Sequence, residues 1–196
     1  VKDAIFELLS TDKNRLRQEA IKAIDKKWLK RDTKWNEKLK SILTESKSGR
    51  VKSAAIDKLS ENENLEGLDS IIAPLLNDSS YLVENSALKF LNKVDSVKAL
   101  DYAYKRIFSN SYNILNTVFE IIAQSKNPKE IIYFEQAIEK AQGYKKLAIY
   151  SNFGGYLAYM NEKVMENYID KFEAMTSSTE EADNYCSKTA LRMLKS

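Results

Sequence analysis

Hydrophobic residues recur along this chain with the spacing of an amphipathic helix, and the same pattern returns several times. In its clearest copy, Val83, Ala87, Leu88 and Leu91 fall on one helical face. The polar residues at 78–80 come just before it, and their side chains can accept hydrogen bonds from the free N–H groups of a first helical turn. The pattern therefore predicts a helix that starts close to residue 80.

Four further stretches repeat this pattern. They are Leu16, Ala20, Ile21 and Ile24; Val51, Ala55, Ile56 and Leu59; Ile114, Val118, Phe119 and Ile122; and Cys186, Ala190, Leu191 and Leu194. The first positions of the first four copies lie 35, 32 and 31 residues apart, a period typical of stacked helix pairs. We expect an all-α fold, a right-handed array of about six antiparallel helix pairs in a single domain over residues 1–196. Its buried positions should include Leu16, Val51, Val83, Ile114, Ala20, Ala55 and Ala87.

Composition agrees with this fold class. The 196 residues include only 5 Gly and 2 Pro, so few residues are available for the tight turns of a sheet protein. No apolar run approaches the ~20 residues that a membrane-spanning helix requires. The chain begins directly in a helical pattern, and we expect it to be a piece of a longer protein.

The chain contains no histidine. This absence excludes histidine-based zinc sites and Ser-His or Cys-His nucleophiles from the segment. Cys186 is the lone cysteine and stands on an apolar helical face, which favours a buried core residue. We expect no catalytic residue, no metal ligand and no cofactor in this segment, and neither peptidase activity nor stoichiometric zinc when it is isolated.

The most basic stretch, residues 26–35, also contains two tryptophans. Residues 1–60 hold 16 Lys+Arg against 9 Asp+Glu, so positive charge is concentrated in this part of the chain. Lysines beside Trp28 and Trp35 could contact phosphates and stack on bases. The alternative is a solvated helix end with both tryptophans packed inward, which the interleaved acidic residues favour.

Two places interrupt the helical pattern. Pro74 lies inside a predicted helix and removes a backbone donor, so we expect a kink or a shifted helix end there. The stretch 144–159 carries Asn152 where other copies have alanine, followed by Gly154 and Gly155. This pair, with Tyr150, Tyr156 and Tyr159 around it, is compatible with a partner surface or with a close internal helix approach; the close approach is favoured.

Helix pairs of this length with this second-helix pattern resemble HEAT-type repeats. The run Leu76-Asn77-Asp78-Ser79-Ser80-Tyr81-Leu82-Val83, followed by Ala87-Leu88 and by the helix that carries Ala99 and Leu100, is similar to the C-terminal helical region of bacterial aminopeptidase N-like zinc metallopeptidases. The resemblance implies a non-catalytic accessory domain that packs on a catalytic domain of the same chain and restricts peptide access. Zinc would belong to that catalytic domain, because no H-E-x-x-H motif is present here.

Two other classes stay open: a free-standing protein-binding scaffold and, ranked last, a nucleic-acid module. In a helical array the second helices line the concave side, and their non-core positions face the bound partner. The predicted binding residues are Arg17, Lys52, Glu84, Asn85, Asn113 and Asn116. This basic and amide-rich set suits a peptide or a neighbouring domain better than a phosphate backbone.

Overall fold

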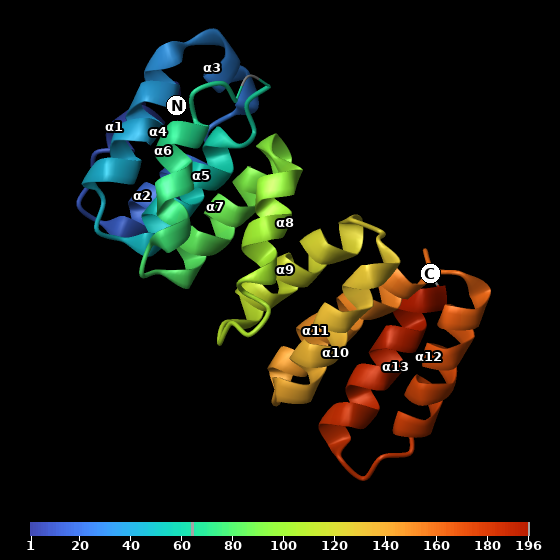
Figure 1. Ribbon diagram of the computed structural model, residues 1–196. Helices are drawn as coiled ribbons and strands as arrows, with labels where there is room; N and C mark the ends of the chain where they lie inside the picture. The colour runs from blue at the N-terminus through green and yellow to red at the C-terminus, as the bar shows by residue number, and fades with distance from the viewer. Residues whose placement is uncertain (64, 196) are drawn as a thin grey trace. The chain divides into compact units, whose positions relative to one another are not determined.

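The computed structural model describes residues 1–63 and 65–195, and every regular element in this part of the chain is a helix (Figure 1). The predicted all-α class is confirmed. The chain forms two compact units, Val1–Asp95 and Ser96–Ser196, which we call unit 1 and unit 2.

Unit 1 is built from three helix pairs and one additional short helix. Its elements are α1 (Lys2–Leu8), α2 (Asn14–Lys22), α3 (Lys26–Arg31), α4 (Thr33–Glu45), α5 (Gly49–Leu59), α6 (Asp69–Ile72), the 3-10 helix η1 (Ala73–Asn77) and α7 (Tyr81–Val94). Helix α1 pairs with α2, α4 with α5, and α6 with η1 packs on α7. The second helices also pack on one another, α2 on α5 and α5 on α7.

Unit 2 repeats this plan with longer second helices. Its elements are α8 (Ser96–Tyr104), α9 (Tyr112–Gln124), the 3-10 helix η2 (Pro128–Glu130), α10 (Ile131–Lys140), α11 (Tyr144–Leu157), α12 (Glu162–Met175) and α13 (Glu181–Lys195). The pairs are α8 with α9, α10 with α11 and α12 with α13, and the second helices α9, α11 and α13 pack in succession. The described residues thus contain six pairs, the number that the repeat period predicts.

The repeated apolar positions form the cores of both units. Val51, Val83 and Ile114 are fully buried. The residues that follow them by one turn, Ala55, Ala87 and Val118, are buried as well, as is Ala20. In unit 2, Phe134 lies at the centre of an aromatic cluster, with ring centroids 4.9 Å from Phe119 and 4.7 Å from Phe153. Aromatic pairs at these distances add ~0.5–1.5 kcal/mol beyond the area they bury.

Leu16 is a correction to the sequence prediction, because it is 46% exposed. It stands in the first turn of α2, and α2 is the first second helix of its unit. Only α5 packs on it among the second helices, whereas Val51 lies between two such neighbours. The face of α2 that corresponds to the buried faces at Val51 and Val83 is therefore not covered by a neighbouring helix at Leu16.

Capping side chains set the helix ends in the basic stretch. The Asp25 carboxylate accepts the Lys27 N–H at 2.7 Å and starts α3, so α2 does not continue to Trp28. Trp35 is fully buried and lies 5.3 Å from Trp28 between ring centroids. The inward packing of this tryptophan pair is confirmed for Trp35, and Trp28 is half-buried beside it.

The two interruptions of the pattern have local causes. At Pro74 the chain changes from α6 to the 3-10 helix η1, as expected where a backbone donor is missing. At Gly154, a Cβ atom would lie 2.9 Å from the Cα of Ala190 and closer still to its carbonyl oxygen. Glycine at this position thus permits the close approach of α11 and α13, and the interpretation as internal packing is confirmed for Gly154 but not for Gly155, whose Cβ would have no neighbour within 4 Å.

Candidate functional site

The predicted binding residues of unit 1 lie in different surroundings. Lys52 forms a half-buried ion pair with Asp78 at 3.0 Å, which ties α5 to the turn before α7. Arg17 and Asn85 are half-buried. Glu84 is only 3% exposed, so its predicted non-core, partner-facing placement is wrong. The segment before α7 folds back on α5, which engages Lys52 in an intramolecular contact.

The surroundings of the Lys52–Asp78 pair lower the pKa of the Asp78 carboxyl. Partial burial alone would raise the pKa of the Asp78 carboxyl, but hydrogen bonds from the Ser80 N–H and from Lys52, together with the charge of Lys52, lower it. The Asp78 carboxylate accepts the Ser80 N–H at 2.9 Å. This pair therefore helps to set the start of α7.

The predicted residues of unit 2 are closer to the surface. Asn113 is exposed on α9, and Asn116 is half-buried one turn later. The side-chain amide of Asn152 on α11 donates to the Oδ1 of Asn116 at 3.2 Å. Asn152, at the position that alanine holds in other copies, thus links two second helices. A partner-binding role for any of these six residues stays a prediction.

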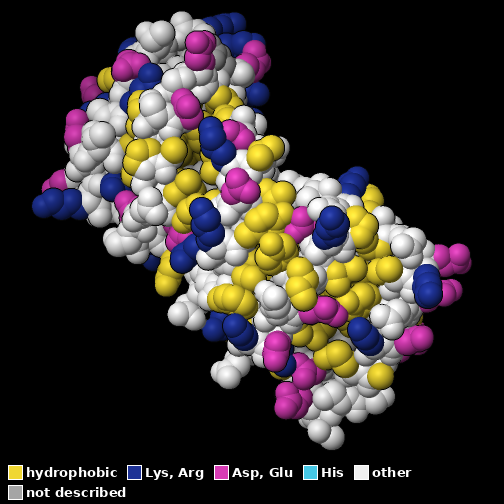
Figure 2. Space-filling view, viewed as in Figure 1, with side chains coloured by type: hydrophobic (Ala, Val, Ile, Leu, Met, Phe, Trp, Pro, Cys, Tyr) yellow, Lys and Arg dark blue, Asp and Glu magenta, His cyan; other side chains and the backbone are white. Residues whose placement is uncertain are grey.

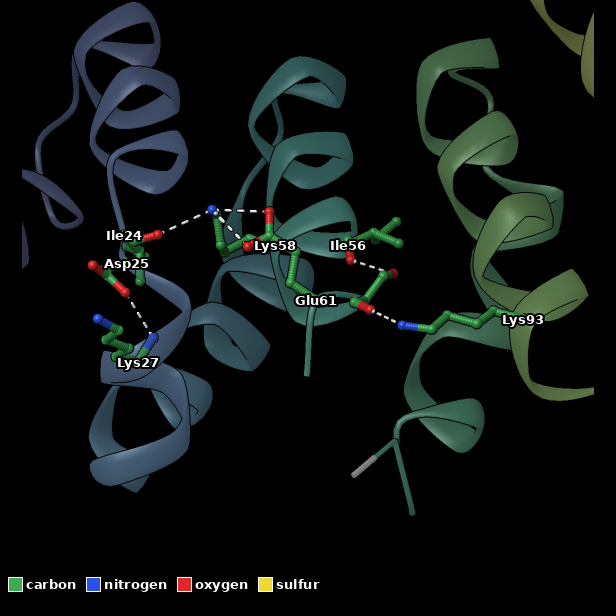
Figure 3. Close-up of polar contacts among 8 residues, drawn as sticks. Ile24, Asp25, Lys27, Ile56, Lys58, Glu61 and Lys93 are labelled. Atoms are coloured by element: carbon green, nitrogen blue, oxygen red, sulfur yellow. Dashed lines mark hydrogen bonds and ion pairs between the residues drawn. The ribbon is translucent and has the colours of Figure 1, made fainter. Parts of the chain in front are cut away.

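Lysine contacts that the sequence did not predict join successive second helices of unit 1 (Figure 3). Lys58 of α5 is 8% exposed, and its ammonium donates to the Ile24 carbonyl and to the Glu61 carboxylate, each at 3.0 Å. Lys93 of α7, which is exposed, donates to the Ser60 carbonyl. Each lysine satisfies a carbonyl after the end of the preceding second helix, where a positive charge is also favoured by the helix dipole.

A small groove lies between α2 and α5, next to these lysine contacts. It has a volume of about 190 Å³. Its lining is almost entirely polar: Gln18, Lys22, Ser53, Ala54, Asp57, Lys58 and Glu61. Lys58 already donates to the Ile24 carbonyl and to the Glu61 carboxylate. Part of the charge in this groove is therefore neutralised by contacts within the protein.

A much larger groove lies between the start of α11 and the first half of α13 in unit 2. Its volume is about 720 Å³, within the range of ~300–1,000 Å³ that is usual for ligand sites. It is lined by Gly143, Tyr144, Leu147, Glu181, Ala182, Asn184, Tyr185, Cys186 and Lys188. We call it the tyrosine groove, because Tyr144 is 86% exposed and Tyr185 is 59% exposed at its walls. Hydrophobic side chains also gather on the face of unit 2 that Figure 2 shows.

Local backbone features place the two tyrosines. Gly143 has a φ of 57°, in a region that side chains disfavour, and it allows the chain to turn sharply into α11 with Tyr144 as the first helical residue. An ion pair between Lys146 and Asp183 joins the two helices near their starts. Further along, the contact of Gly154 with Ala190 holds them together. The Lys146–Asp183 ion pair and the Gly154–Ala190 contact therefore hold the two helices of the groove in place relative to each other.

Cys186 at the base of the groove is a core residue, as the sequence predicts. It is buried, and burial with the nearby Asp183 raises the pKa of its thiol, although Lys146 acts in the opposite direction. The thiol is thus neutral near pH 7 and a poor nucleophile. Within residues 1–63 and 65–195, no three His, Cys, Asp or Glu side chains come together as a metal site.

The other tyrosines near the glycine pair have different environments. Tyr150 and Tyr156 are buried in unit 2, and burial together with the Glu130 carboxylate raises the pKa of Tyr156 to about 12. The Tyr156 hydroxyl donates to the Asn127 carbonyl. Tyr159 is exposed beneath Lys126. Of the tyrosines that the sequence pointed to, Tyr150 and Tyr156 are thus core residues, whereas Tyr144 and Tyr185 at the groove were not predicted. The position of Tyr144 directly after Gly143 could have indicated an exposed residue at a helix start.

Comparison with known proteins adds no family. No family model matches the chain, and no curated protein matches its sequence. A solved structure with similarity is the crystal structure of an engineered protein, a Northeast Structural Genomics Consortium target, with a TM-score of 0.47 and 15% identity over 99% of this chain and 96% of that chain. Similarity at this level carries no argument about function. No helix of the described residues is both long and apolar enough to cross a membrane.

Proposed function

We propose that this chain is a protein-binding scaffold of stacked helix pairs, and that unit 2 holds a peptide segment of its partner in the tyrosine groove. The observation that supports this function is the groove itself. Tyrosine is enriched at protein interfaces because it offers a large apolar surface, a polar hydroxyl and little conformational entropy to lose. Two such side chains stand exposed at a groove that is also lined by the apolar side chains of Leu147 and Ala182.

A HEAT-like solenoid remains the arrangement that we propose for the six pairs. A narrower form of the proposal is the accessory domain of a zinc aminopeptidase, which rests on the sequence resemblance around 76–91. In that case the partner is the catalytic domain of the same chain. An H-E-x-x-H helix encoded upstream in the same reading frame would support this role, and a complete upstream frame without one would contradict it.

Nucleic-acid binding is the weaker alternative. The buried Trp35 offers no exposed ring on which a base could stack. Several lysines of the basic stretch are also engaged: Lys30 lies 2.7 Å from Glu63, and Lys34 lies 3.5 Å from Asp32. We expect duplex DNA to bind weakly and to dissociate as salt rises. Sub-micromolar binding at physiological salt that Lys52→Glu abolishes would promote this alternative to first place.

The test of the proposed function is selection of random peptides displayed on phage against three forms of the chain. The first is the unmodified protein, and the second carries Tyr144→Ser with Tyr185→Ser. The third is a matched control with Tyr81→Ser and Tyr112→Ser, which removes two exposed tyrosines outside the groove. We expect enrichment on the first and third forms and its loss on the second. Equal enrichment on all three would overturn the proposal.

A further inference from the structure

The α13 wall of the tyrosine groove carries side chains of opposite charge at its two ends. Glu181, Tyr185 and Lys188 all line the groove and follow one another at helical positions i, i+4 and i+7. Seven residues of helix span about 10 Å. An acidic group thus stands at one end of this wall and a basic group at the other, with the Tyr185 ring between them.

These two charges are available to a ligand. Glu181 and Lys188 are both exposed, and within the described residues neither forms an ion pair. Of the other charges near the start of the two helices, Lys146 pairs with Asp183 and Lys145 lies 3.5 Å from the Asn110 amide oxygen. Glu180, directly before α13, is exposed but is not among the residues that line the groove. The α11 wall contributes Tyr144 and Leu147, which carry no charge at neutral pH.

The separation of Glu181 and Lys188 along α13 favours one form of the ligand backbone. About 10 Å corresponds to less than two turns of helix, and an isolated helix of that length is unstable in water. In an extended chain, which advances ~3.3 Å per residue, the first and the last of three alternate positions lie about 13 Å apart, a distance close to the separation of Glu181 and Lys188 along α13. Side chains at alternate positions of such a chain point to one side.

We propose, on the basis of the proposed function, that the tyrosine groove recognises an extended peptide in which an aromatic side chain stands between a basic and an acidic residue at alternate positions. The aromatic side chain enters between Tyr144 and Tyr185 over Leu147. The basic residue pairs with Glu181, and the acidic residue pairs with Lys188. Charge complementarity thus determines which peptides are preferred, and the aromatic contact supplies most of the affinity.

Synthetic peptides with a fluorescent label test this inference by anisotropy. The reference peptide has arginine, tryptophan and glutamate at alternate positions in a Gly-Ser background. Its relatives carry two arginines, two glutamates or two glutamines at the flanking positions. We expect the mixed-charge peptide to bind most tightly, by about three-fold for each matched charge compared with the glutamine peptide. High salt should remove this preference while binding through tryptophan remains.

Charge reversals on the protein make the test specific. Glu181→Lys should transfer the preference to the doubly acidic peptide, and Lys188→Glu should transfer it to the doubly basic peptide. Both side chains are exposed, so circular dichroism should show an unchanged helical content. Equal affinity for all four peptides, with binding that still requires Tyr144 and Tyr185, would overturn the charge inference and leave the proposed function standing. Failure of all four to bind would overturn the inference, whereas the proposed function would be overturned only by peptide selection that does not depend on these tyrosines.

Discussion

The grooves of the two units occupy comparable places, each between two second helices, yet they differ in size and chemistry. The groove between α2 and α5 measures about 190 Å³ and has charged walls, whereas the tyrosine groove measures about 720 Å³ and has aromatic walls. In unit 1, Lys58 reaches across to the Ile24 carbonyl and the Glu61 carboxylate. In unit 2, Tyr144 and Tyr185 remain exposed beside their groove.

This difference shows that one repeated plan can carry two kinds of groove. Where polar side chains reach the neighbouring helix, they satisfy its free carbonyls and stabilise the stack. Where aromatic side chains stay exposed, they leave apolar surface that a partner can cover. The repeat pattern alone is the same in both cases, so the non-core residues decide the size and the chemistry of each groove.

The largest expected effect concerns Gly154, the glycine that permits the close approach of α11 and α13. Gly154→Ala should lower the free energy of unfolding by ~1–3 kcal/mol or more, because its Cβ would collide with the backbone of Ala190, which cannot rotate away as a side chain could. Urea denaturation followed by circular dichroism measures this change. The same variant should alter the tyrosine groove by separating its two helices.

Gly155→Ala is the matched control. A Cβ atom at Gly155 has no neighbour within 4 Å, and alanine is favoured over glycine in a helix interior. The free energy of unfolding should therefore rise by ~0.5–1 kcal/mol. Equal effects of the two substitutions would show that α11 and α13 do not approach each other as described.

The lysine contacts of unit 1 should have the next largest effect. Lys58→Ala removes a buried ammonium and leaves the Ile24 carbonyl without this donor, so the free energy of unfolding should fall by ~1–3 kcal/mol. Lys47→Ala, at an exposed lysine before α5, should change it by less than ~0.5 kcal/mol. Similar losses of unfolding free energy from both variants would show that Lys58 contributes no more to stability than an ordinary surface lysine.

The Lys52–Asp78 pair predicts a dependence of stability on pH. The folded protein lowers the pKa of Asp78, so the ionised carboxylate stabilises the fold above its ordinary pKa of ~3.9. This contribution is lost as pH falls below that value and through the lower pKa of the folded state. Urea denaturation of the unmodified protein and of Asp78→Asn should give a difference that is constant above about pH 5 and shrinks in acid. A difference that grows in acid would contradict the direction of this pKa shift.

The smallest expected effect on stability is that of the groove tyrosines. Tyr144→Ser and Tyr185→Ser should each change the free energy of unfolding by no more than ~0.5 kcal/mol, because both side chains are exposed. Thermal and urea denaturation measure this. A loss comparable to that of Lys58→Ala would mean that the tyrosines act in packing, and the contrast between the two grooves would disappear.

The sequence predicted those features that depend on local periodicity. Val51, Val83 and Ile114 are buried because a recurring helical face faces the same kind of neighbour in each repeat. Leu16 was wrongly predicted as buried because its neighbour depends on its place at the end of a stack. Lys58 resembles a surface lysine in the sequence, and its partner lies 34 residues earlier.

The tyrosine groove could not be predicted for a similar reason. Tyr144 and Tyr185 are 41 residues apart, and no local pattern connects them. They meet at one groove only because α11 packs on α13, with Gly154 against Ala190. The predicted binding residues were chosen by their register on each helix, which indicates orientation but not whether neighbouring side chains cover them. Glu84 shows the limit of that reasoning, since it is buried.

The most direct measurement of the central contrast is nuclear magnetic resonance with labelled methyl groups and a peptide obtained by phage selection. Ala182 and Leu147 report on the tyrosine groove, and Ala54 reports on the groove between α2 and α5. The account predicts that addition of the peptide shifts the methyl resonances of Leu147 and Ala182 in proportion to occupancy, while that of Ala54 stays unchanged. Shifts at Ala54 without shifts at Leu147 and Ala182 would contradict it.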